Sequence, residues 1–489
     1  MSGKEKNEDQ LHAMRHSLAH IMAAAIQKLW PEAKFGVGPV TDTGFYYDVD
    51  LGETTLTPED LPKIEAEMGK IIEADLPLEQ FDLPIAEAIE REKQAGQDYK
   101  VALLQDLQNK GTTAAEEVEP SSLGVDEENE EQGPESVSYY QLGDFVDLCR
   151  GPHVKSTGQV GAFRLHQLAG AYWRGDENNP MLQRIYGVAF PTQEEVDEYF
   201  ELLEEARERD HRKIGQELGL FTFSDLVGAG LPLFTPKGTA LREILGQYSQ
   251  QLREARGFQR VWIPHAAKTD LYQTSGHWDK FGDELFLVTS QATDDQLVLK
   301  PMNCPHHAQI YASQQRSYRD LPVKYMENTT VYRDEKSGEL HGLSRVRSIT
   351  QDDCHVFARE DQIEQSVTEL VEAGKQLNHQ LDMELKLQLS FRDDSDDYLG
   401  DATLWERAQA DLERIASDQN IEYYTQDGEA SFYGPKLDFM AVDVLGREWE
   451  LATVQLDFVQ PGRFELEYVD ETGERQTPVM MHAALLGSL

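Results

Sequence analysis

The N-terminal part of the chain holds two pairs of residue types that commonly bind metals, each pair spaced by four positions. The pairs are His16 with His20, and Cys149 with His153. Residues four apart share one face of a helix, but Gly151 and Pro152 exclude a helix between the second pair. Histidine and cysteine are zinc ligands, and histidines also orient water for hydrolysis. A metal site and a hydrolytic pocket therefore stay open as alternatives, and Asp147 and Arg150 beside the second pair favour either one over coincidence.

A second group of possible ligands lies in three segments that are far apart in the chain. The segments are KPMNCPHH (300–307), TQDDCHVF (350–357) and VMMHAALLGSL (479–489). Their spacing is not that of a zinc finger, whereas a catalytic zinc often has three protein ligands and an open fourth position. Cys304, His355 and His482 suit that plan. Spacing alone is weak support, because scattered histidines and cysteines are mostly structural.

Helices and strands that position these residues can be predicted from apolar periodicity and from turn residues. The predicted helices span 11–30, two segments within 57–95, 193–218, 238–256 and 360–381. Strand-like segments occur at 36–50, in VSYYQLGDFVDLC and in MLQRIYGVAF. Segment 116–135 is acidic and poor in apolar residues, which is typical of disorder. This pattern predicts an α+β protein with an antiparallel sheet in its second half.

Several N-terminal segments resemble the editing domain of bacterial-type threonyl-tRNA synthetases. They are RHSLAH (15–20), GPVTDTGFYYD (38–48), DYKV (98–101), FVDLCRGPHV (145–154), and AGAYWRGD with LQRIYG (169–187). The resemblance covers nearly all of residues 11–190 and implies hydrolysis of seryl-tRNA made in error. By motif match, the pocket is lined by His16, His20, Lys100, Asp147, Cys149 and His153. A related domain in alanyl-tRNA synthetases holds zinc with a similar set, so the resemblance leaves open whether a metal is needed.

The rest of the chain, about 220–489, resembles a class II aminoacyl-tRNA synthetase core. YRDEKSGELHGLSRVRSITQDD (332–353) is similar to motif 2, and GFQRVWIPH (257–265) is similar to motif 1. SFYGPKLDF and TVQLDF, within 431–458, match the threonyl branch in particular. The resemblance implies an antiparallel sheet flanked by helices and a threonine–tRNA ligase that uses threonine, ATP and threonine tRNA. Motif 1 of the family carries a proline at a dimer interface, here Pro264, which implies a homodimer.

Carried over position by position, the resemblance assigns roles in the synthetic site. The implied zinc ligands are Cys304, His355 and His482, and one zinc ion takes the amino and hydroxyl groups of threonine. Residues implied to surround threonine are Asp353, Tyr433 and Gln455, with Gln351 and Lys436 nearby. Those implied to contact ATP, which is accompanied by Mg²⁺, are Arg333, Arg345 and, on the adenine side, Glu335. Guanidinium groups are forked positive charges suited to phosphates, and they stabilise charge that develops when a carboxylate attacks the α-phosphate.

Amino-acid selectivity gives one reason for both a zinc ion and an editing domain. Valine is nearly isosteric with threonine, and a hydrophobic pocket separates such isosteres by only roughly a hundredfold. A metal position that requires a hydroxyl group rejects valine far more strongly. Serine has the hydroxyl and is smaller, so it enters the site, and a second, hydrolytic sieve becomes necessary.

The chain departs from the family pattern in three places. Ile349 stands where a phenylalanine usually stacks on adenine, and Ala483 follows His482 where an arginine is common. The sequence given ends at Leu489, within motif 3, without the anticodon-binding domain or the small N-terminal ubiquitin-like domain. A helix is predicted at 480–489 that frays and loosens His482, which implies poor synthetic activity beside intact editing.

These observations divide the chain into a series of predicted regions. The regions are a polar tail (1–10), an editing domain (11–192) with a disordered acidic loop near 113–137, a linker helix (193–219) and a class II catalytic domain (220–489). Two other functions fit the motifs: a trans-acting deacylase with a vestigial synthetase core, and a threonine-sensing protein without turnover. ATP–pyrophosphate exchange with threonine separates a ligase from both.

Composition restricts the setting in which the protein works. The chain has 489 residues, no run of ~18 apolar residues that would span a membrane, and no apolar stretch of a signal peptide near its start. Three cysteines in 489 residues fit a reducing cytoplasm. The formal net charge of −44 opposes nucleic-acid binding, which usually needs a basic surface. Because ~1 M salt shortens the Debye length to about 3 Å, this charge indicates a salt-loving source.

Overall fold

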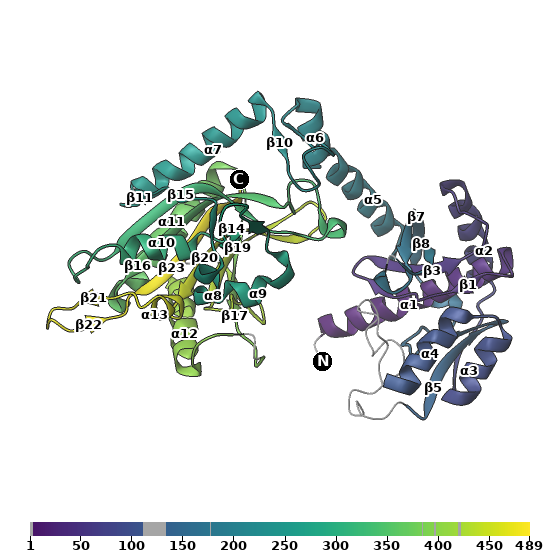
Figure 1. Cartoon of the computed structure of the whole chain (residues 1–489). Helices are drawn as coiled ribbons and strands as arrows, with labels where there is room; N and C mark the ends of the chain where they lie inside the picture. The colour runs from purple at the N-terminus through teal and green to yellow at the C-terminus, as the bar shows by residue number, and fades with distance from the viewer. Residues whose placement is uncertain (1–2, 111–133, 177, 384, 396–397, 419–421) are drawn as a thin grey trace. The chain divides into compact units, whose positions relative to one another are not determined.

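The computed structural model describes residues 3–110, 134–176, 178–383, 385–395, 398–418 and 422–489. The chain folds into two compact units, Met1–Glu201 and Leu202–Leu489 (Figure 1). Each unit has its own buried core and is described by itself. Among the described residues, no helix is long and apolar enough to cross a membrane.

The first unit is built around helix α1 (Gly3–Leu29), whose buried residues lie at the centre of the largest core of this unit. The helix packs against α2 (Leu61–Glu73) and against an antiparallel sheet. The sheet strands are β1 (Lys34–Phe35), β2 (Val40–Thr41), β3 (Gly44–Asp50), β7 (Ala162–Tyr172) and β8 (Met181–Phe190). Their order is β1-β3-β8-β7, and β2 pairs with β3. The predicted helix at 11–30 is therefore present and ends before Pro31, which cannot continue it.

A smaller layer of the same unit carries the second half of the candidate pocket. Its strands are β4 (Leu78–Pro84), β5 (Ser136–Leu142) and β6 (Phe145–Leu148), paired antiparallel in that order. Helices α3 (Ile85–Gln94) and α4 (Asp98–Lys110) pack against each other and share a core with β5. Strand β6 ends at Leu148, so Cys149 is the first residue of the loop that follows.

The second unit is an eight-stranded sheet whose order is β11-β15-β16-β23-β20-β19-β17-β18 (Figure 1). The strands are β11 (Gln259–Arg260), β15 (Val323–Tyr332), β16 (Ser348–Ala358), β17 (Leu385–Phe391), β18 (Tyr423–Asp427), β19 (Lys436–Val442), β20 (Glu448–Asp457) and β23 (Val479–Ser488). All neighbours are antiparallel except the two edge pairs, β11 with β15 and β17 with β18. This is the antiparallel sheet that was predicted for the second half of the chain.

Two helices cover one face of this sheet, and the candidate site lies on the opposite face. Helices α11 (Ile363–Gln380) and α12 (Ala402–Asp418) form a core with Val356, Val454 and Met481 of the central strands. Because side chains alternate along a strand, the residues next to these, His355, Gln455 and His482, face the opposite side. The remaining helices of the unit are α7 (Pro236–Glu254), α8 (Thr269–Ser275), α9 (His277–Phe281), α10 (Cys304–Ala312) and α13 (Gln460–Arg463).

Short strands complete the second unit. Strands β9 (Phe221–Thr222) and β10 (Leu233–Phe234) pair with each other, as do β21 (Tyr468–Val469) and β22 (Arg475–Gln476). Strands β12 (Ala266–Lys268), β14 (Gln296–Leu299) and β13 (Leu287–Thr289) form a three-stranded antiparallel sheet.

Three sequence-based expectations about tail, linker and loop need correction or comment. Residues 3–10 continue helix α1 rather than form a polar tail, because Glu, Lys and Gln are good helix formers. The predicted single linker helix is two helices, α5 (Gln193–Glu208) and α6 (His211–Leu218), since Asp210 accepts a hydrogen bond from Arg212 N and starts a new helix. Most of the predicted acidic loop lies outside the described residues, but 136–137 at its end belong to β5.

The predicted helix at 480–489 is wrong, because these residues form β23 between β16 and β20. Met, Ala and Leu favour helices locally, yet a strand paired on both sides is also an unbroken apolar run. Tertiary pairing therefore overrides the local propensity. His482 lies on this strand and is 4% exposed, so it is held by two neighbouring strands rather than by a fraying helix.

Candidate active sites

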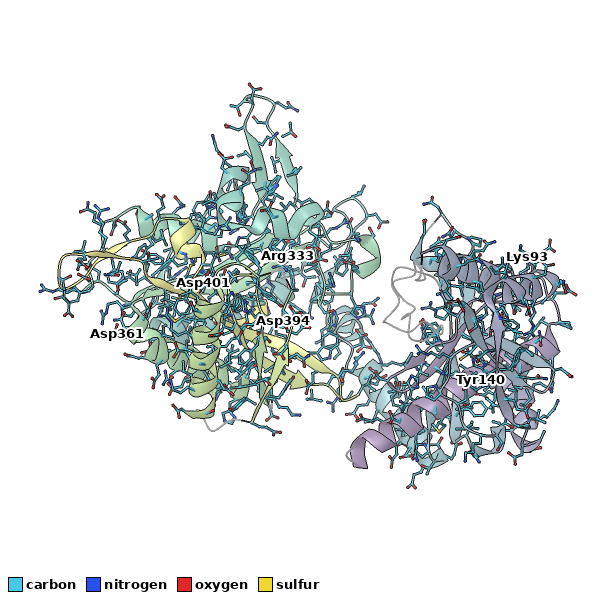
Figure 2. The ribbon with its side chains drawn as sticks, turned by 90° about the horizontal axis from the view of Figure 1, so that it is seen from below. Lys93, Tyr140, Arg333, Asp361, Asp394 and Asp401 are labelled. Carbon is cyan, nitrogen blue, oxygen red and sulfur yellow. The ribbon has the colours of Figure 1, made fainter. Side chains whose placement is uncertain are left out.

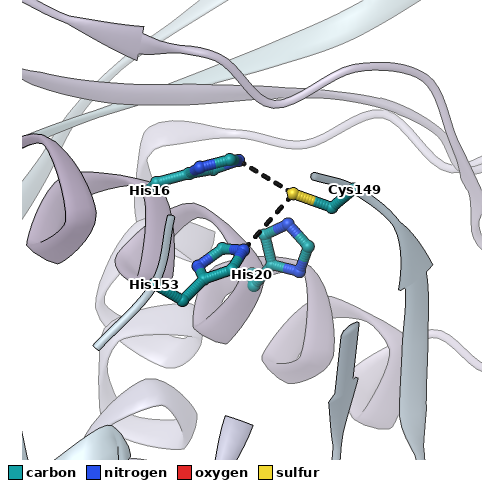
Figure 3. A group of neighbouring side chains, drawn as sticks. All are labelled: His16, His20, Cys149 and His153. Atoms are coloured by element: carbon teal, nitrogen blue, oxygen red, sulfur yellow. Dashed lines mark hydrogen bonds between the residues drawn. The ribbon is translucent and has the colours of Figure 1, made fainter. Parts of the chain in front are cut away.

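The first candidate site lies in the first unit, where the two predicted pairs come together (Figure 3). His16 and His20 project from one face of α1, and Cys149 and His153 lie on the loop after β6. Cys149 Sγ is 3.2 Å from His16 Nε2 and 3.3 Å from His153 Nε2. The four side chains each offer one possible ligand atom within 4.8 Å of the others.

A serine on α1 holds the loop against the helix. Ser17 Oγ lies 3.1 Å from His153 Nδ1 and accepts a hydrogen bond from Val154 N at 3.0 Å. It donates to the carbonyl oxygen of Ala13 one turn earlier. Ser17 is completely buried, so this hydroxyl group fixes both the loop backbone and the His153 ring.

A buried ion pair forms the other wall of the first site. Lys100 Nζ from α4 lies 2.6 Å from Asp147 Oδ1 of β6. Tyr47 of β3 donates a short hydrogen bond to Asp147 Oδ2 and accepts one from Lys100 at 3.2 Å. All three side chains are buried, and His20 Nε2 is 3.9 Å from Asp147 Oδ2. The predicted editing residues are thus one contiguous group, which Tyr47 joins.

Burial controls protonation in the first site. It lowers the pKa of His16 to about 4, with repulsion from His12 a smaller cause, and it holds the pKa of His20 well below 6.5. Burial also raises the pKa of the Cys149 thiol to about 12. The histidines are therefore neutral at neutral pH and can accept a proton from water, whereas Cys149 is a thiol and not a thiolate nucleophile.

The pocket above this group is small. Its volume is about 40 Å³, and it is lined by His16, His20, Val37, Gly38, Pro39, Tyr47, Lys100, Asp147, Leu148 and Cys149. Such a pocket holds a water molecule beside a short polar substituent. Its chemistry suits hydrolysis at a small acyl group, with neutral imidazoles and a fixed ammonium group around the reacting atoms.

The second candidate site is one row of residues across the large sheet. His355 of β16 is directly opposite His482 of β23, which is opposite Gln455 of β20, which is opposite Lys436 of β19. Directly opposite residues in neighbouring strands point to the same face. Side chains from four strands, up to 127 positions apart (482 − 355), therefore line one surface.

A cysteine from a helix completes the possible ligand set of this row. Cys304 is the first residue of α10, and each of Cys304, His355 and His482 offers one possible ligand atom within 4.8 Å of the others. All three residues are buried. His482 Nδ1 is buried without a hydrogen-bond partner among the described residues. A soft thiolate with two imidazoles is a donor set that suits zinc, and the unpartnered nitrogen is a free ligand atom, so these residues fit the ion.

The residues predicted to surround threonine lie beside this ligand set. Tyr433 donates a short hydrogen bond to Gln455 Oε1, and its ring stacks on the His482 ring with centroids 4.8 Å apart. Asp353 is two positions before His355 on β16 and accepts a hydrogen bond from Asn303 Nδ2 at 2.7 Å. Gln351 precedes it on the same strand, next to a register shift between Gln351 and Asp353.

Lys436, at the far end of the row, is held by two carboxylates. Its Nζ lies 3.0 Å from Asp438 Oδ2 and 3.0 Å from Glu450 Oε2. Asp438 is completely buried and also accepts a hydrogen bond from Ser390 Oγ at 2.7 Å.

The two predicted phosphate-binding arginines lie on the connection between β15 and β16, which pair as an antiparallel hairpin. Arg333 follows β15 and lies amid the second unit in Figure 2; its guanidinium is 4.9 Å from the Phe281 ring centroid, and burial lowers its pKa. Arg345 pairs with Glu335 at 2.8 Å and with Glu339 at 3.1 Å. The hairpin therefore brings the two arginines and Glu335 together.

Comparison with known proteins gives the family of both parts of the chain. Residues 286–489 match the tRNA synthetase class II core domain (G, H, P, S and T), and residues 137–186 match the threonyl and alanyl tRNA synthetase second additional domain. A threonine–tRNA ligase of Gloeobacter violaceus is 47% identical over 495 residues, which cover 99% of this chain and 75% of that protein. The chain belongs to the threonine–tRNA ligase family. A Rubrobacter xylanophilus ligase is 46% identical over 98% of this chain and 71% of its own length.

A solved structure supports the same assignment within the family. The RNA binding domain of threonyl-tRNA synthetase from Cryptosporidium parvum is 34% identical, with a TM-score of 0.54. The match covers 57% of this chain and 70% of that one.

Sequence reasoning missed several residues that this threonine–tRNA ligase family member places at the two sites. They are Tyr47, Asn303, His307 and Asp457. Asn303 and His307 lie within KPMNCPHH, and Asp457 lies within TVQLDF, so the segments were identified but not these members. Only the strand register and the fold of α10 show which residue each one contacts.

Proposed function

We propose that this chain activates threonine with ATP, transfers it to threonine tRNA, and hydrolyses seryl-tRNA made in error. Ligase activity is assigned to residues 220–489, hydrolysis to residues 11–192, and 193–219 link them. The observation that carries the proposal is the row His355–His482–Gln455 on one sheet face, completed by Cys304. It supports a single site that reads an amino acid through a metal and hydrogen bonds together.

Cys304, His355 and His482 would hold one zinc ion, with a coordination position left for threonine. When bound, the ion would supply a Lewis acid for the amino and hydroxyl groups of threonine. Valine has no hydroxyl group and would lack the second of these bonds. Asp353 would accept the ligand ammonium, and Asn303 holds its carboxylate in place. The stacked Tyr433 ring and its bond to Gln455 close the pocket over the side chain.

ATP, accompanied by Mg²⁺, would bind at the β15–β16 hairpin. Arg333 Nε has no hydrogen-bond partner among the described residues, so a donor is free for a phosphate oxygen. Arg345 would bind a second oxygen, and Glu335 orients it through their ion pair. Together they stabilise the charge that develops as the threonine carboxylate attacks the α-phosphate and pyrophosphate leaves. Lys436 supplies a further positive charge at the end of the row.

In the first unit, neutral His16 and His20 would orient a water molecule toward the ester carbon of seryl-tRNA. Lys100, fixed by Asp147, would stabilise the developing oxyanion. A preference for serine over the larger threonine would be decided in the pocket that these residues line. A metal ion at the same four ligand-type residues is the alternative that the geometry also supports.

A homodimer through motif 1 is supported by an exposed aromatic side chain beside Pro264, which is itself exposed. Trp262, two positions before Pro264, is 77% exposed. A large apolar side chain exposed in this way can belong to a surface that a partner covers. Trp262→Glu should shift the protein toward monomer in sedimentation velocity. A dimer unaffected by Trp262→Glu would refute this surface.

The experiment that tests the proposed function separates the two units. Cys304→Ser should abolish zinc binding and threonine-dependent ATP–pyrophosphate exchange, while Cys354→Ser, a buried cysteine one residue before His355 on the opposite face, should keep both. His16→Ala with His20→Ala should abolish seryl-tRNA deacylation, while His12→Ala, exposed one turn earlier, should not. Exchange that persists in Cys304→Ser, or deacylation that persists in the double variant, refutes the respective half.

The three free cysteines also support a reducing, cytoplasmic setting.

A further inference from the structure

Asp457 is a completely buried carboxylate that contacts a proposed zinc ligand. It is the last residue of β20, two positions after Gln455, and its Oδ2 lies 2.9 Å from His482 Nε2. We infer that Asp457 is a positioning residue that fixes the ring orientation and the tautomer of His482, so that Nδ1 faces the zinc ion. This inference rests on the zinc site of the proposed function and goes beyond it by naming how one ligand is held.

The hydrogen bonds around Asp457 indicate which group donates in its contact with His482. Its Oδ1 accepts from Val459 N at 2.8 Å and from Gln460 N at 2.9 Å, and its Oδ2 accepts from Gln460 Nε2 at 2.8 Å. A carboxylate with three such donors is an acceptor toward His482 as well. His482 Nε2 must therefore carry the ring proton.

Fixing the proton on Nε2 leaves the lone pair on Nδ1. This is the nitrogen of His482 that is buried without a partner among the described residues. Metal-binding histidines commonly donate their other ring N–H to a carboxylate, which fixes the tautomer and raises the basicity of the ligand. The pair of observations, a saturated carboxylate on one ring nitrogen and an unpartnered second nitrogen, is the arrangement that this rule requires.

The neighbouring ligand has a partner of its own. His355 Nδ1 lies 2.8 Å from His307 Nδ1, so one of these two atoms must donate and the other accept. If His355 binds zinc through Nε2, its proton is on Nδ1 and His307 is the acceptor. His307 is completely buried, which leaves protein groups rather than water to set this choice. Both imidazole ligands thus have a dedicated partner on the side away from the ligand set.

Asp457 also holds the turn before helix α13 through its two backbone contacts, so a test must separate support of the turn from support of the ligand. Asp457→Asn does this. Its Oδ1 can still accept from Val459 N and Gln460 N, but an amide NH₂ would replace Oδ2 and face His482 Nε2. The same NH₂ faces the side-chain amide of Gln460, whose Oε1 has no partner among the described residues and can turn to accept from it. Two donors cannot face each other, so His482 would move its proton to Nδ1 and lose the ligand lone pair there.

The experiment titrates metal-free protein with Zn²⁺ in competition with a chromophoric chelator. Asp457→Asn should weaken zinc binding by about 10–100-fold, with the melting temperature of the metal-free protein nearly unchanged. The matched control is Asp438→Asn, a carboxylate equally buried on the adjacent strand that contacts no proposed ligand, and zinc affinity should not change. Zinc affinity in Asp457→Asn equal to that of the wild type overturns the inference while leaving the zinc site itself intact.

The wild-type protein provides a test that does not depend on folding of a variant. In protein labelled with ¹⁵N-histidine and loaded with Zn²⁺, His482 should be protonated at Nε2 and metal-bound at Nδ1. The signal is assigned by its loss in His482→Asn. A proton on Nδ1 overturns the inference. Cys304→Ser should bind no zinc. If the wild-type protein also binds no zinc, both the proposed zinc site and this inference are overturned.

Discussion

Arg253 is a completely buried arginine on α7 that holds the strand carrying Asp353 and His355. Its Nη1 donates to the carbonyl oxygens of Asp352 at 2.7 Å and Asp353 at 3.1 Å, and its Nη2 donates to Asn328 Oδ1 at 2.8 Å. The Asp352 carboxylate, 3.9 Å from Nη2, accepts from Leu485 N and Leu486 N of β23. Arg253 and Asp352 therefore tie α7, β16 and β23 together.

Arg253→Met keeps a similar side-chain volume but leaves these acceptors without their donors. Removing one partner of a buried ion pair costs about 3–5 kcal/mol, because the remaining charge is uncompensated. We expect the free energy of unfolding of the second unit to fall by that amount. Because the Asp353 carbonyl loses its donor, the KM for threonine should rise more than the KM for ATP.

The assay is urea unfolding followed separately for the two units, since a chain with two units need not unfold in one transition. Arg256→Met is the control: Arg256 lies one turn later on the same segment, is only partly buried and donates to Leu252 O at 2.9 Å. A double-mutant cycle with Asp352→Asn should give a coupling of about 0.5–3 kcal/mol. If Arg253→Met unfolds like Arg256→Met, or the cycle is additive, the network does not stabilise the sheet as argued.

Three further predictions concern the first unit and the surface. Burial, then repulsion from Asp147, raises the pKa of Glu92, so this carboxyl group stabilises the folded state at low pH and destabilises it as pH rises through its folded pKa. Glu92→Gln should therefore raise the melting temperature at pH 7 but not below pH 4.5. An equal effect of the substitution at both pH values would contradict this prediction. Tyr47→Phe should cost about 1–3 kcal/mol, because Asp147 loses a buried donor, and should slow deacylation without changing pyrophosphate exchange; unchanged deacylation would refute the role of Tyr47. The net charge of −44 predicts a melting temperature that rises from low to molar KCl, and a steady fall would contradict it.

The sequence predicted well those parts of the fold that local patterns determine. Helix α1 was predicted from its apolar spacing and from Pro31, and α7 and α11 were found in the same way. Strand β23 was not, because an apolar run such as MMHAALLG is ambiguous between helix and buried strand without knowledge of its neighbours. Pairing with β16 and β20, which are distant in the chain, decides the matter.

The candidate sites were predictable only in part for a related reason. The ligand types were visible, but their spacing along the chain does not show that His355 and His482 are cross-strand partners. That required the family resemblance or the register itself. Residues such as Asp457 and Tyr47 carry no local signal, since a buried aspartate in a strand and a tyrosine in FYYD look like ordinary members of their segments.

The need to tell serine from threonine explains why one chain carries both sites. A single methyl group separates serine from threonine, and a binding site gains only about 1–3 kcal/mol from it. A hydroxyl-seeking metal position does nothing to enlarge that difference, because both amino acids carry the hydroxyl. In the proposed function the first unit adds a second sieve, because it hydrolyses seryl-tRNA in the pocket lined by His16, Tyr47 and Lys100. Selection by affinity at one site and by hydrolysis at the other multiplies two modest factors, which explains why both sites are kept in one chain.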